Sequence, residues 1–318
     1  MPRRVQHVHL DSPPELSALK VEALAAINRL RRHVPEPEPC PGDIPAYRRA
    51  AVLLGLFGGR HGDLHAVLSH RAVALRSHGG DTAIPGGRFE AKDKDLEATA
   101  RREAWEETGL PIDSRRAIKL CELRPFLSAN ELVVTPIVVW LIDPLIQPKL
   151  NPSEVQSIFS VPLEAFLYHV PPTSLRSSLR LASTPQPDRY RPPSEVSGPS
   201  DWHNCRDISW LGCRVRRHNF WHRSNPIRGL TSDILIHCAM MAYDKTPSFS
   251  MTAPGQPTND ELIRKAFKGP LAVKKRRVRP RMSGLEQPVD DDNKEGTHRN
   301  SAGPRPLPAL GATKHSKL

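Results

Sequence analysis

Three glutamates, Glu103, Glu106 and Glu107, lie within five positions of a chain whose formal net charge is +12. Residues three and four positions apart on an α-helix share a face, so these carboxylates would point in one direction and repel one another. Carboxylate oxygens are the ligands that Mg²⁺ prefers, and bound Mg²⁺ commonly bridges protein carboxylates to phosphate oxygens. The cluster is therefore either a solvated helix face balanced by Arg101 and Arg102, or a site for divalent cations.

A glycine turn upstream favours the second interpretation. The segment Ile84-Pro85-Gly86-Gly87 leads into the acidic segment, and its glycines allow the backbone to approach a ligand closely. A glycine turn followed by an acidic helix is typical of metal-assisted phosphate chemistry.

The elements that must hold these groups follow from the hydrophobic pattern. Apolar runs at 50–57 and 65–70, joined by a glycine-rich turn, predict a β-hairpin. The segment Leu96–Thr108 is rich in Leu, Glu, Ala and Arg and predicts a helix. Residues 118–127 and 132–142 predict two further strands. The acidic helix should thus lie between two pairs of strands.

Composition predicts three regions along the chain. Residues 1–48 read as an amphipathic helix over 16–34 and a Pro-rich linker. Residues 49–245 form the expected domain, with a Pro- and Ser-rich insertion at about 171–207. Residues 246–318 are expected to be a basic, Pro-rich tail with little structure.

Three further elements are expected in the second half of the domain. A short helix is predicted at 162–166 and a β-leaning segment at 208–221. A last helix is predicted over Leu230–Tyr243, with Thr231 or Ser232 as its N-cap.

The cysteines and the N-terminus limit the class of protein. The five cysteines are odd in number and contain no C-x-x-C pair, which argues against a disulfide framework or a zinc knuckle and favours a reducing compartment. The sequence shows no apolar core of a signal peptide and no apolar run long enough to cross a bilayer. We therefore expect a soluble protein that is not secreted and does not insert into membranes.

The tail carries two competing signals. Residues 262–318 hold 14 Lys and Arg against 5 Asp and Glu, so most of the excess positive charge lies there. The basic run Lys274–Arg281 resembles a nuclear-import or nucleic-acid patch, but no aromatic residue accompanies it to stack bases. Ser316-Lys317-Leu318 matches the address read by the peroxisomal import receptor. We expect a peroxisomal location and consider a nucleic-acid partner the weaker alternative.

The acidic segment and its glycine turn resemble the Nudix box, whose usual form is G-x5-E-x7-R-E-U-x-E-E-x-G-U, with U an aliphatic residue. Gly87, Arg102-Glu103 and Glu106-Glu107 match it. The interval from Gly87 to Arg102 is one residue longer than usual, and Lys94 takes the place of the first glutamate. The resemblance implies an α+β fold, the Nudix-type α/β/α sandwich with a mixed central β-sheet.

This longer interval resembles that of a subgroup, the Nudix enzymes that act on coenzyme A. These enzymes carry a similarly lengthened acidic segment, which reads PGGRFEAKDKD in this chain. The upstream signature of that subgroup is also matched in its spacing, by Arg71, Arg76, Gly80 and the turn ending at Gly87. The similarity extends over about 50–243. It implies a coenzyme A diphosphatase that releases 3',5'-ADP and 4'-phosphopantetheine.

The resemblance also implies roles for individual residues. Glu103, Glu106 and Glu107 would hold Mg²⁺ or Mn²⁺, with Glu106 and Glu107 central to catalysis. Arg102 would pair with a helix glutamate and fix its rotamer, although an exposed arginine is the alternative. Glu154 is the candidate general base, because this family often takes its base from a loop; an ordinary solvated carboxylate is the alternative.

Substrate contacts and supporting carboxylates are less firmly indicated. Arg71 and Arg76 could bind the phosphates beside Gly86 and Gly87, or lie exposed on the surface. One of Glu90, Asp93 and Asp95 could bind metal or orient Arg102, and Asp95 could instead be only the N-cap of the helix. Glu164 is the rival candidate for the general base.

Two other functions stay open. Another Nudix substrate, such as ADP-ribose or NADH, is the enzymatic alternative, although the zinc ribbon common among NADH enzymes is missing from the sequence. An RNA-binding protein that acts through its basic tail is the alternative of another class.

Overall fold

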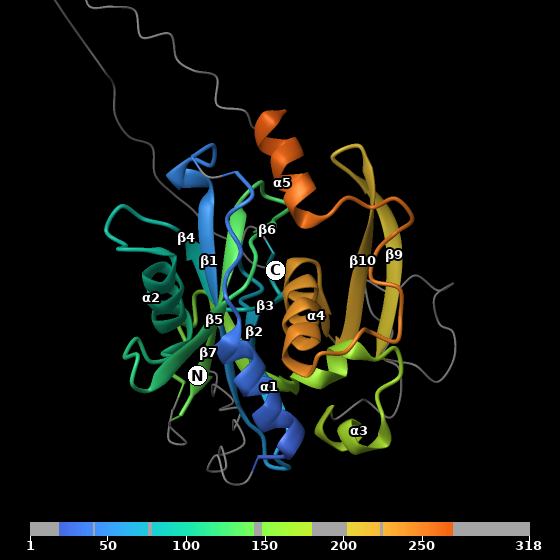
Figure 1. The fold of residues 1–318 in the computed structure, drawn as a ribbon. Helices are drawn as coiled ribbons and strands as arrows, with labels where there is room; N and C mark the ends of the chain where they lie inside the picture. Colours follow the sequence, from blue (N-terminus) through green and yellow to red (C-terminus); the bar gives the residue numbers. More distant parts are fainter. Residues whose placement is uncertain are drawn as a thin grey trace, which may run out of the picture. The chain divides into compact units, whose positions relative to one another are not determined.

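A mixed β-sheet forms the centre of the protein in the computed structural model, which describes residues 19–40, 42–75, 78–142, 148–179, 202–222 and 225–269 (Figure 1). The sheet contains eight strands within these ranges. They are β1 (Arg49–Gly58), β2 (Leu64–Arg71), β3 (Thr82–Ala83), β4 (Gly86–Arg88), β5 (Ala117–Glu122), β6 (Phe126–Leu127), β7 (Val133–Leu141) and β8 (Val155–Pro162).

The pairing of β1 with its neighbours makes the sheet mixed. β1 runs parallel to β7 and antiparallel to β2, so the predicted hairpin is confirmed. β7 is buried along its whole length, which explains its nearly continuous run of Val, Ile and Leu. The predicted strand at 118–127 is divided in two, because only its two ends, β5 and β6, pair with β7.

Helices cover both faces of this sheet. Helix α2 (Leu96–Thr108) buries Ala100 and Ala104 against one face. Helices α1 (Val21–Arg32) and α4 (Leu230–Tyr243) belong to the apolar cluster of the other face, and Figure 1 shows them on the side away from α2. The fold is therefore the predicted α+β sandwich of helices around a mixed sheet. No helix of the described ranges is long and apolar enough to cross a membrane.

A second, three-stranded antiparallel sheet follows in the chain. It consists of β9 (His203–Trp210), β10 (Cys213–His222) and β11 (Asn225–Arg228). The predicted β-leaning segment at 208–221 is thus a hairpin, whose turn at Leu211 and Gly212 adopts positive φ at both residues. Leu211 does not signal such a turn, so the sequence pattern did not separate the two strands.

Three short helical segments accompany the sheets in the part of the chain that the structure describes. Two 3₁₀ helices, η2 (Ala46–Arg48) and η3 (Leu163–Leu167), flank the first sheet, and η3 corresponds to the short helix predicted at 162–166. Helix α3 (Thr173–Leu179) lies within the predicted insertion at 171–207, of which residues 180–201 lie outside the described ranges.

The region after residue 246 differs from the expectation. Helix α5 (Asn259–Lys268) begins with a capping box, in which the Thr258 and Glu261 side chains bond each other's backbone N–H groups. Its apolar face, which includes Ile263 and Phe267, is buried against Leu127 and neighbouring residues. The expectation of little structure from 246 onward was wrong for 259–268, because the pattern T-x-x-E before an amphipathic run was not recognised.

The predicted N-cap of α4 was also wrong. Gly229 occupies the N-cap position without a side-chain hydrogen bond. The Ser232 hydroxyl instead donates to the Gly229 carbonyl at 2.7 Å, and the Thr231 hydroxyl donates to the Thr82 carbonyl. Both hydroxyls therefore bond to backbone carbonyls, and neither caps an N–H group at the start of the helix.

Candidate functional site

Helix α2 carries the acidic segment and is fixed at both ends. At its start the Asp95 carboxylate accepts a hydrogen bond from the Ala98 N–H at 2.8 Å. At its end Gly109 adopts φ 71°, and an added Cβ there would lie 2.7 Å from the Lys149 backbone nitrogen. Asp95 is therefore the helix N-cap, one of its two predicted roles, and Gly109 allows the chain to turn back closely.

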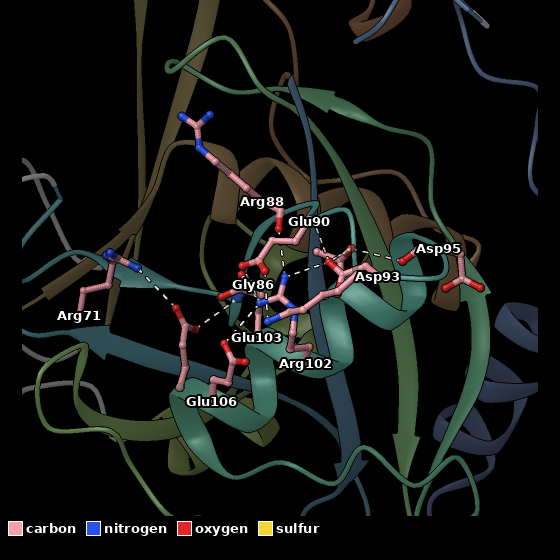
Figure 2. A network of polar contacts seen from close by, with 12 residues as sticks. Arg71, Gly86, Arg88, Glu90, Asp93, Asp95, Arg102, Glu103 and Glu106 are labelled. Atoms are coloured by element: carbon pink, nitrogen blue, oxygen red, sulfur yellow. Dashed lines mark hydrogen bonds and ion pairs between the residues drawn. The ribbon is translucent and has the colours of Figure 1, made fainter. Parts of the chain in front are cut away.

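Asp93 orients the predicted Nudix-box arginine. Arg102 donates from Nε and Nη2 to the two carboxylate oxygens of Asp93, at 2.8 and 2.9 Å (Figure 2). Asp93 also accepts from the Thr99 hydroxyl and the Glu90 N–H. The hydrogen bonds from Arg102 hold the pKa of Asp93 well below its usual range, against the effect of burial.

The same arginine lies among the clustered glutamates. Its Nη1 donates to Glu103 at 2.9 Å and to Glu106 at 3.3 Å, and its Nη2 donates to the backbone carbonyl of Arg88. The predicted pairing of Arg102 with a helix glutamate is therefore present. The positive charge of the guanidinium also offsets part of the repulsion between the carboxylates.

Glycine is required at positions 86 and 87 because other atoms lie where a Cβ would be. A Cβ on Gly86 would lie 2.3 Å from the Ala51 carbonyl oxygen, because β4 is tightly paired with β1. A Cβ on Gly87 would lie 2.4 Å from the Glu103 carboxyl group. The first glycine therefore serves the sheet, and the second leaves room for a carboxylate of α2.

Glu107 is a buried carboxylate whose charge is only partly compensated. Its oxygens accept a hydrogen bond from the Gly86 N–H at 3.2 Å and lie 3.8 Å from Arg71 Nη1. Burial raises the pKa of Glu107 to about 7, although Arg71 and the Gly86 N–H act in the other direction. Glu103 and Glu154 contribute to the increase through charge repulsion.

The loop that carries Glu154 is tied to the end of α2. The Lys149 N–H donates to the Thr108 carbonyl and the Asn151 N–H donates to the Glu107 carbonyl, both at 3.0 Å. The Glu154 carbonyl accepts from Ala72 N–H at 2.8 Å. These bonds hold Glu154 close enough to raise the pKa values of Glu103 and Glu107, after the larger effect of burial.

The rival base is engaged elsewhere. Glu164 belongs to η3, where its carboxylate accepts from Tyr168 Oη at 2.9 Å and pairs with Lys245 Nζ at 2.8 Å. Between the two candidates, the structure brings Glu154 to the acidic cluster and gives Glu164 the partners of a structural ion pair.

The donor chemistry of the cluster fits a hard divalent cation. Glu103, Glu106, Glu107 and Glu154 supply carboxylate oxygens, and burial followed by mutual repulsion raises the pKa of Glu103 as well. Arg102 donates a hydrogen bond to one carboxylate oxygen of Glu103 and to one of Glu106. Within the described ranges, no three His, Cys, Asp or Glu side chains are arranged as a group of metal ligands. The excess negative charge is what a cation such as Mg²⁺ or Mn²⁺ would neutralise.

A cavity of about 630 Å³ adjoins the glycine turn, with Gly86 and Gly87 in its lining. The charged residues among its described lining are strongly biased toward arginine, with Asp81 as the single carboxylate. The arginines are Arg71, Arg88, Arg206, Arg217 and Arg228. A concave surface with this charge favours polyanionic ligands over neutral ones.

Arg228 connects the two sheets across this cavity. Its Nη2 lies 2.7 Å from Asp81 Oδ1, and Asp81 also contacts His78. Burial raises the pKa of Asp81, but the hydrogen bonds from Arg228 and His78 outweigh it and hold this pKa below its ordinary value. The carboxylate is therefore ionised and fixes β11 beside β3.

Most of the predicted site residues converge at this place. The residues brought together are Arg71, Gly86, Gly87, Arg102, Glu103, Glu106, Glu107 and Glu154. Arg76, the basic run 274–281 and the terminal Ser-Lys-Leu lie outside the described residues. The catalytic, metal-binding and substrate-binding roles of the converging residues stay predictions.

The bidentate pair of Asp93 and Arg102 matches one of the two roles expected for Asp93, which were to bind metal or to orient Arg102. Sequence reasoning missed another part of this arrangement. Arg206 and Arg217 were not considered, because their membership in one wall depends on the β9–β10 pairing. Alternating Arg, Ile and Trp at 206, 208 and 210 was the available signal.

Comparison with known proteins supports the family. A model of the NUDIX domain matches residues 46–181. The chain is 35% identical over 212 residues to mitochondrial Nudix hydrolase 15 of Arabidopsis thaliana, covering 65% of this chain and 63% of that protein. It is 33% identical over 209 residues to the uncharacterized Nudix hydrolase NudL of Photorhabdus laumondii, covering 66% of this chain and 91% of that protein.

A third relative carries a specific activity in its name. Peroxisomal coenzyme A diphosphatase 1 of Saccharomyces cerevisiae is 34% identical over 153 residues, which is 40% of this chain and 45% of that protein. The chain thus spans less than two thirds of the yeast and Arabidopsis relatives and nearly all of the bacterial one. With the NUDIX domain match and the acidic site on α2, these similarities show that the chain belongs to the Nudix hydrolase family.

Proposed function

We propose that the protein hydrolyses the pyrophosphate bond of coenzyme A or one of its derivatives, releasing 3',5'-ADP and 4'-phosphopantetheine. The observation that carries this proposal is the cavity itself, which joins the glycine turn of the acidic site to five arginines. Coenzyme A combines a pyrophosphate with a further phosphate on its ribose, so it needs both features. The similarity to a yeast protein named coenzyme A diphosphatase supports the same substrate.

The acidic residues would serve the reaction beside the glycine turn, whose Gly86 and Gly87 line the cavity. Glu103, Glu106 and Glu107 would hold the cation, and Asp93 would keep Arg102 in place beside them. Bound Mg²⁺ or Mn²⁺ supplies charge neutralisation on the diphosphate and lowers the pKa of a water nucleophile. Glu154 would accept the proton of the attacking water, and Arg71 would bind a phosphate oxygen.

The test is a substrate panel with the purified full chain. Coenzyme A, NADH and ADP-ribose are incubated at equal concentrations with Mg²⁺ or Mn²⁺, and the products are identified by mass spectrometry. We expect the highest kcat/KM for coenzyme A, with 3',5'-ADP and 4'-phosphopantetheine in equal amounts. A higher kcat/KM for ADP-ribose or NADH would replace this substrate with another of the same family.

The proposed location is the peroxisome. Ser316-Lys317-Leu318 and the peroxisomal yeast relative support it, whereas the Arabidopsis relative is named mitochondrial. A fluorescent protein fused in front of the chain should co-localise with a peroxisomal marker and lose that pattern when the tripeptide is removed. An unchanged distribution after removal would exclude this signal.

A further inference from the structure

One face of the β9–β10 hairpin forms a wall of the arginine-lined cavity. Arg206 and Trp210 of β9 and Arg217 and Asn219 of β10 all line it. Successive side chains of a strand point to opposite faces, so these alternating positions share one face. The hairpin lies outside 46–181, the range matched by the NUDIX domain model.

The wall contains two arginines at opposite positions of the strand pair. Arg206 and Arg217 are register partners in the antiparallel pair, and like charges at such positions destabilise a sheet. Arg217 is partly balanced, because its Nη1 lies 3.1 Å from Asp233 Oδ2. Among the described residues, no carboxylate forms an ion pair with Arg206. Within the part of the chain that the structure describes, the wall therefore presents Arg206 to the cavity without a paired carboxylate.

The neighbouring register pair behaves differently. Arg216 is opposite Asp207, and the two form a bidentate ion pair with distances of 2.8 and 3.1 Å. Neither residue belongs to the cavity lining. The same hairpin thus pairs Arg216 with a carboxylate on one face and places two arginines opposite each other on the face toward the cavity. Two arginines in register favour the binding of an anion between them.

An aromatic surface lies beside the two cations. The Arg217 guanidinium carbon is 4.8 Å from the centroid of the Trp210 ring. Guanidinium and indole planes are surfaces on which nucleotide bases stack. Phosphate and base could therefore be bound by adjacent groups of the same wall.

We propose that Arg206 and Arg217 bind a phosphate monoester that is separate from the cleaved pyrophosphate, with the attached nucleoside against Trp210. The substrate class is then a nucleoside diphosphate derivative that carries a third phosphate on its ribose. The inference rests on the proposed function, since it assigns the 3'-phosphoadenosine end of coenzyme A to this hairpin. Arg206 is the residue that selects for the third phosphate.

The kinetic test compares coenzyme A with dephospho-coenzyme A, which lacks that phosphate. The wild-type chain should favour coenzyme A, and Arg206→Gln should reduce the ratio of the two kcat/KM values by roughly 10- to 100-fold, as expected for hydrogen bonds to a charged group. The loss should appear mainly in KM. A ratio that is the same in the wild type and in Arg206→Gln would overturn the proposal.

Arg216→Gln is the matched control. It removes an arginine from the same hairpin, on the face outside the cavity. Its ratio should equal that of the wild type. An equal decrease in both variants would indicate a general effect of charge and would count against a site at Arg206.

A binding measurement separates this proposal from the proposed function. Calorimetry with 3',5'-ADP and 5'-AMP measures the contribution of the third phosphate without hydrolysis. Tighter binding of 3',5'-ADP that is lost in Arg206→Gln would support the wall even if coenzyme A were not the substrate. Equal affinities of the wild type for the two nucleotides would overturn the proposed phosphate site, even if coenzyme A were hydrolysed.

Discussion

Asp93 and Arg102 form a bidentate pair beneath the acidic cluster, with both carboxylate oxygens within 2.9 Å of the guanidinium. The pair fixes the Arg102 guanidinium, which also contacts Glu103 and Glu106. We expect Asp93→Asn to lower kcat/KM by roughly 10- to 100-fold, as for other residues that orient a metal ligand. It should also lower the free energy of unfolding by about 1.5 to 3 kcal/mol, because Arg102 loses its main partner.

Asp113 provides a control for this pair. Asp113 and Arg115 also form a bidentate contact, but Arg115 is 89% exposed. Asp113→Asn should leave the free energy of unfolding close to that of the wild type, because exposed ion pairs contribute little. Urea unfolding and steady-state kinetics check both variants; equal effects of the two substitutions would contradict the special role of Asp93.

The two glycines of the turn should fail in different ways. Gly87→Ala places a Cβ against the flexible end of Glu103, so the side chain can move and the fold should be kept. Because the displaced group is a proposed metal ligand, we expect kcat/KM to fall at least tenfold. This factor corresponds to an activation free energy that is higher by roughly 1.4 kcal/mol. Gly86→Ala meets the backbone of Ala51 and should instead destabilise the fold by about 2 kcal/mol or more. Thermal unfolding with parallel assays distinguishes the two; strong destabilisation by Gly87→Ala would be the contrary result.

Glu106 should be needed for cation binding more than for folding. Its side chain is 49% exposed and accepts a hydrogen bond from Arg102. Glu106→Gln should lower kcat by at least about 100-fold, which corresponds to several kcal/mol of lost charge stabilisation. Titration with Mn²⁺ should show weaker binding than in the wild type, and a chelator should abolish wild-type activity.

Glu97→Gln is the control on the same helix. Glu97 pairs with Arg101 and Lys119 and has no contact with the acidic cluster among the described residues. The variant should keep Mn²⁺ affinity and activity. If Glu106→Gln bound Mn²⁺ as well as Glu97→Gln does, the assignment of Glu106 to the cation would be wrong.

His203 should make stability depend on pH. Burial lowers its pKa from 6.5 to about 3, and its ring nitrogens contact His169 and His218. Between pH 6.5 and 3 the unfolded chain binds a proton that the folded chain does not, so stability should fall as the pH is lowered through this window. The expected decrease from this group is roughly 1 kcal/mol for each pH unit.

Comparison of variants isolates this effect from other titrating groups. His203→Asn should be less stable than the wild type at pH 7 but should show a weaker dependence on pH between 6.5 and 4.5. Urea unfolding at a series of pH values measures both proteins; parallel curves for wild type and His203→Asn would contradict the prediction.

Helix α5 should be part of the folded domain. Phe267 is 4% exposed and packs in the cluster that includes Leu127. Phe267→Ala should lower the free energy of unfolding by about 3 kcal/mol, whereas the exposed Lys268→Ala should have little effect. A chain truncated after residue 270 should keep its thermal stability, and one truncated after residue 246 should lose several degrees. Equal melting temperatures for the two truncations would contradict the assignment of α5 to the domain.

The sequence by itself determined the local features of the site. The helix with its three glutamates, the glycine turn and the β1–β2 hairpin could be predicted because each depends on residues a few positions apart. The same spacing indicated the Nudix family, which the comparisons show. It also indicated that Arg102 lies beside the glutamates, since one helical turn separates it from Glu106.

Tertiary structure decided which distant residues join them. Glu154 reaches the cluster through hydrogen bonds from its loop to α2 and β2, and these depend on the packing of the whole sheet. Arg206 and Arg217 become neighbours only when β9 and β10 pair in one register, and a shift by one residue would place them on opposite faces of the hairpin. Local spacing carries no information on such contacts, because they form between segments that approach one another only in the folded chain.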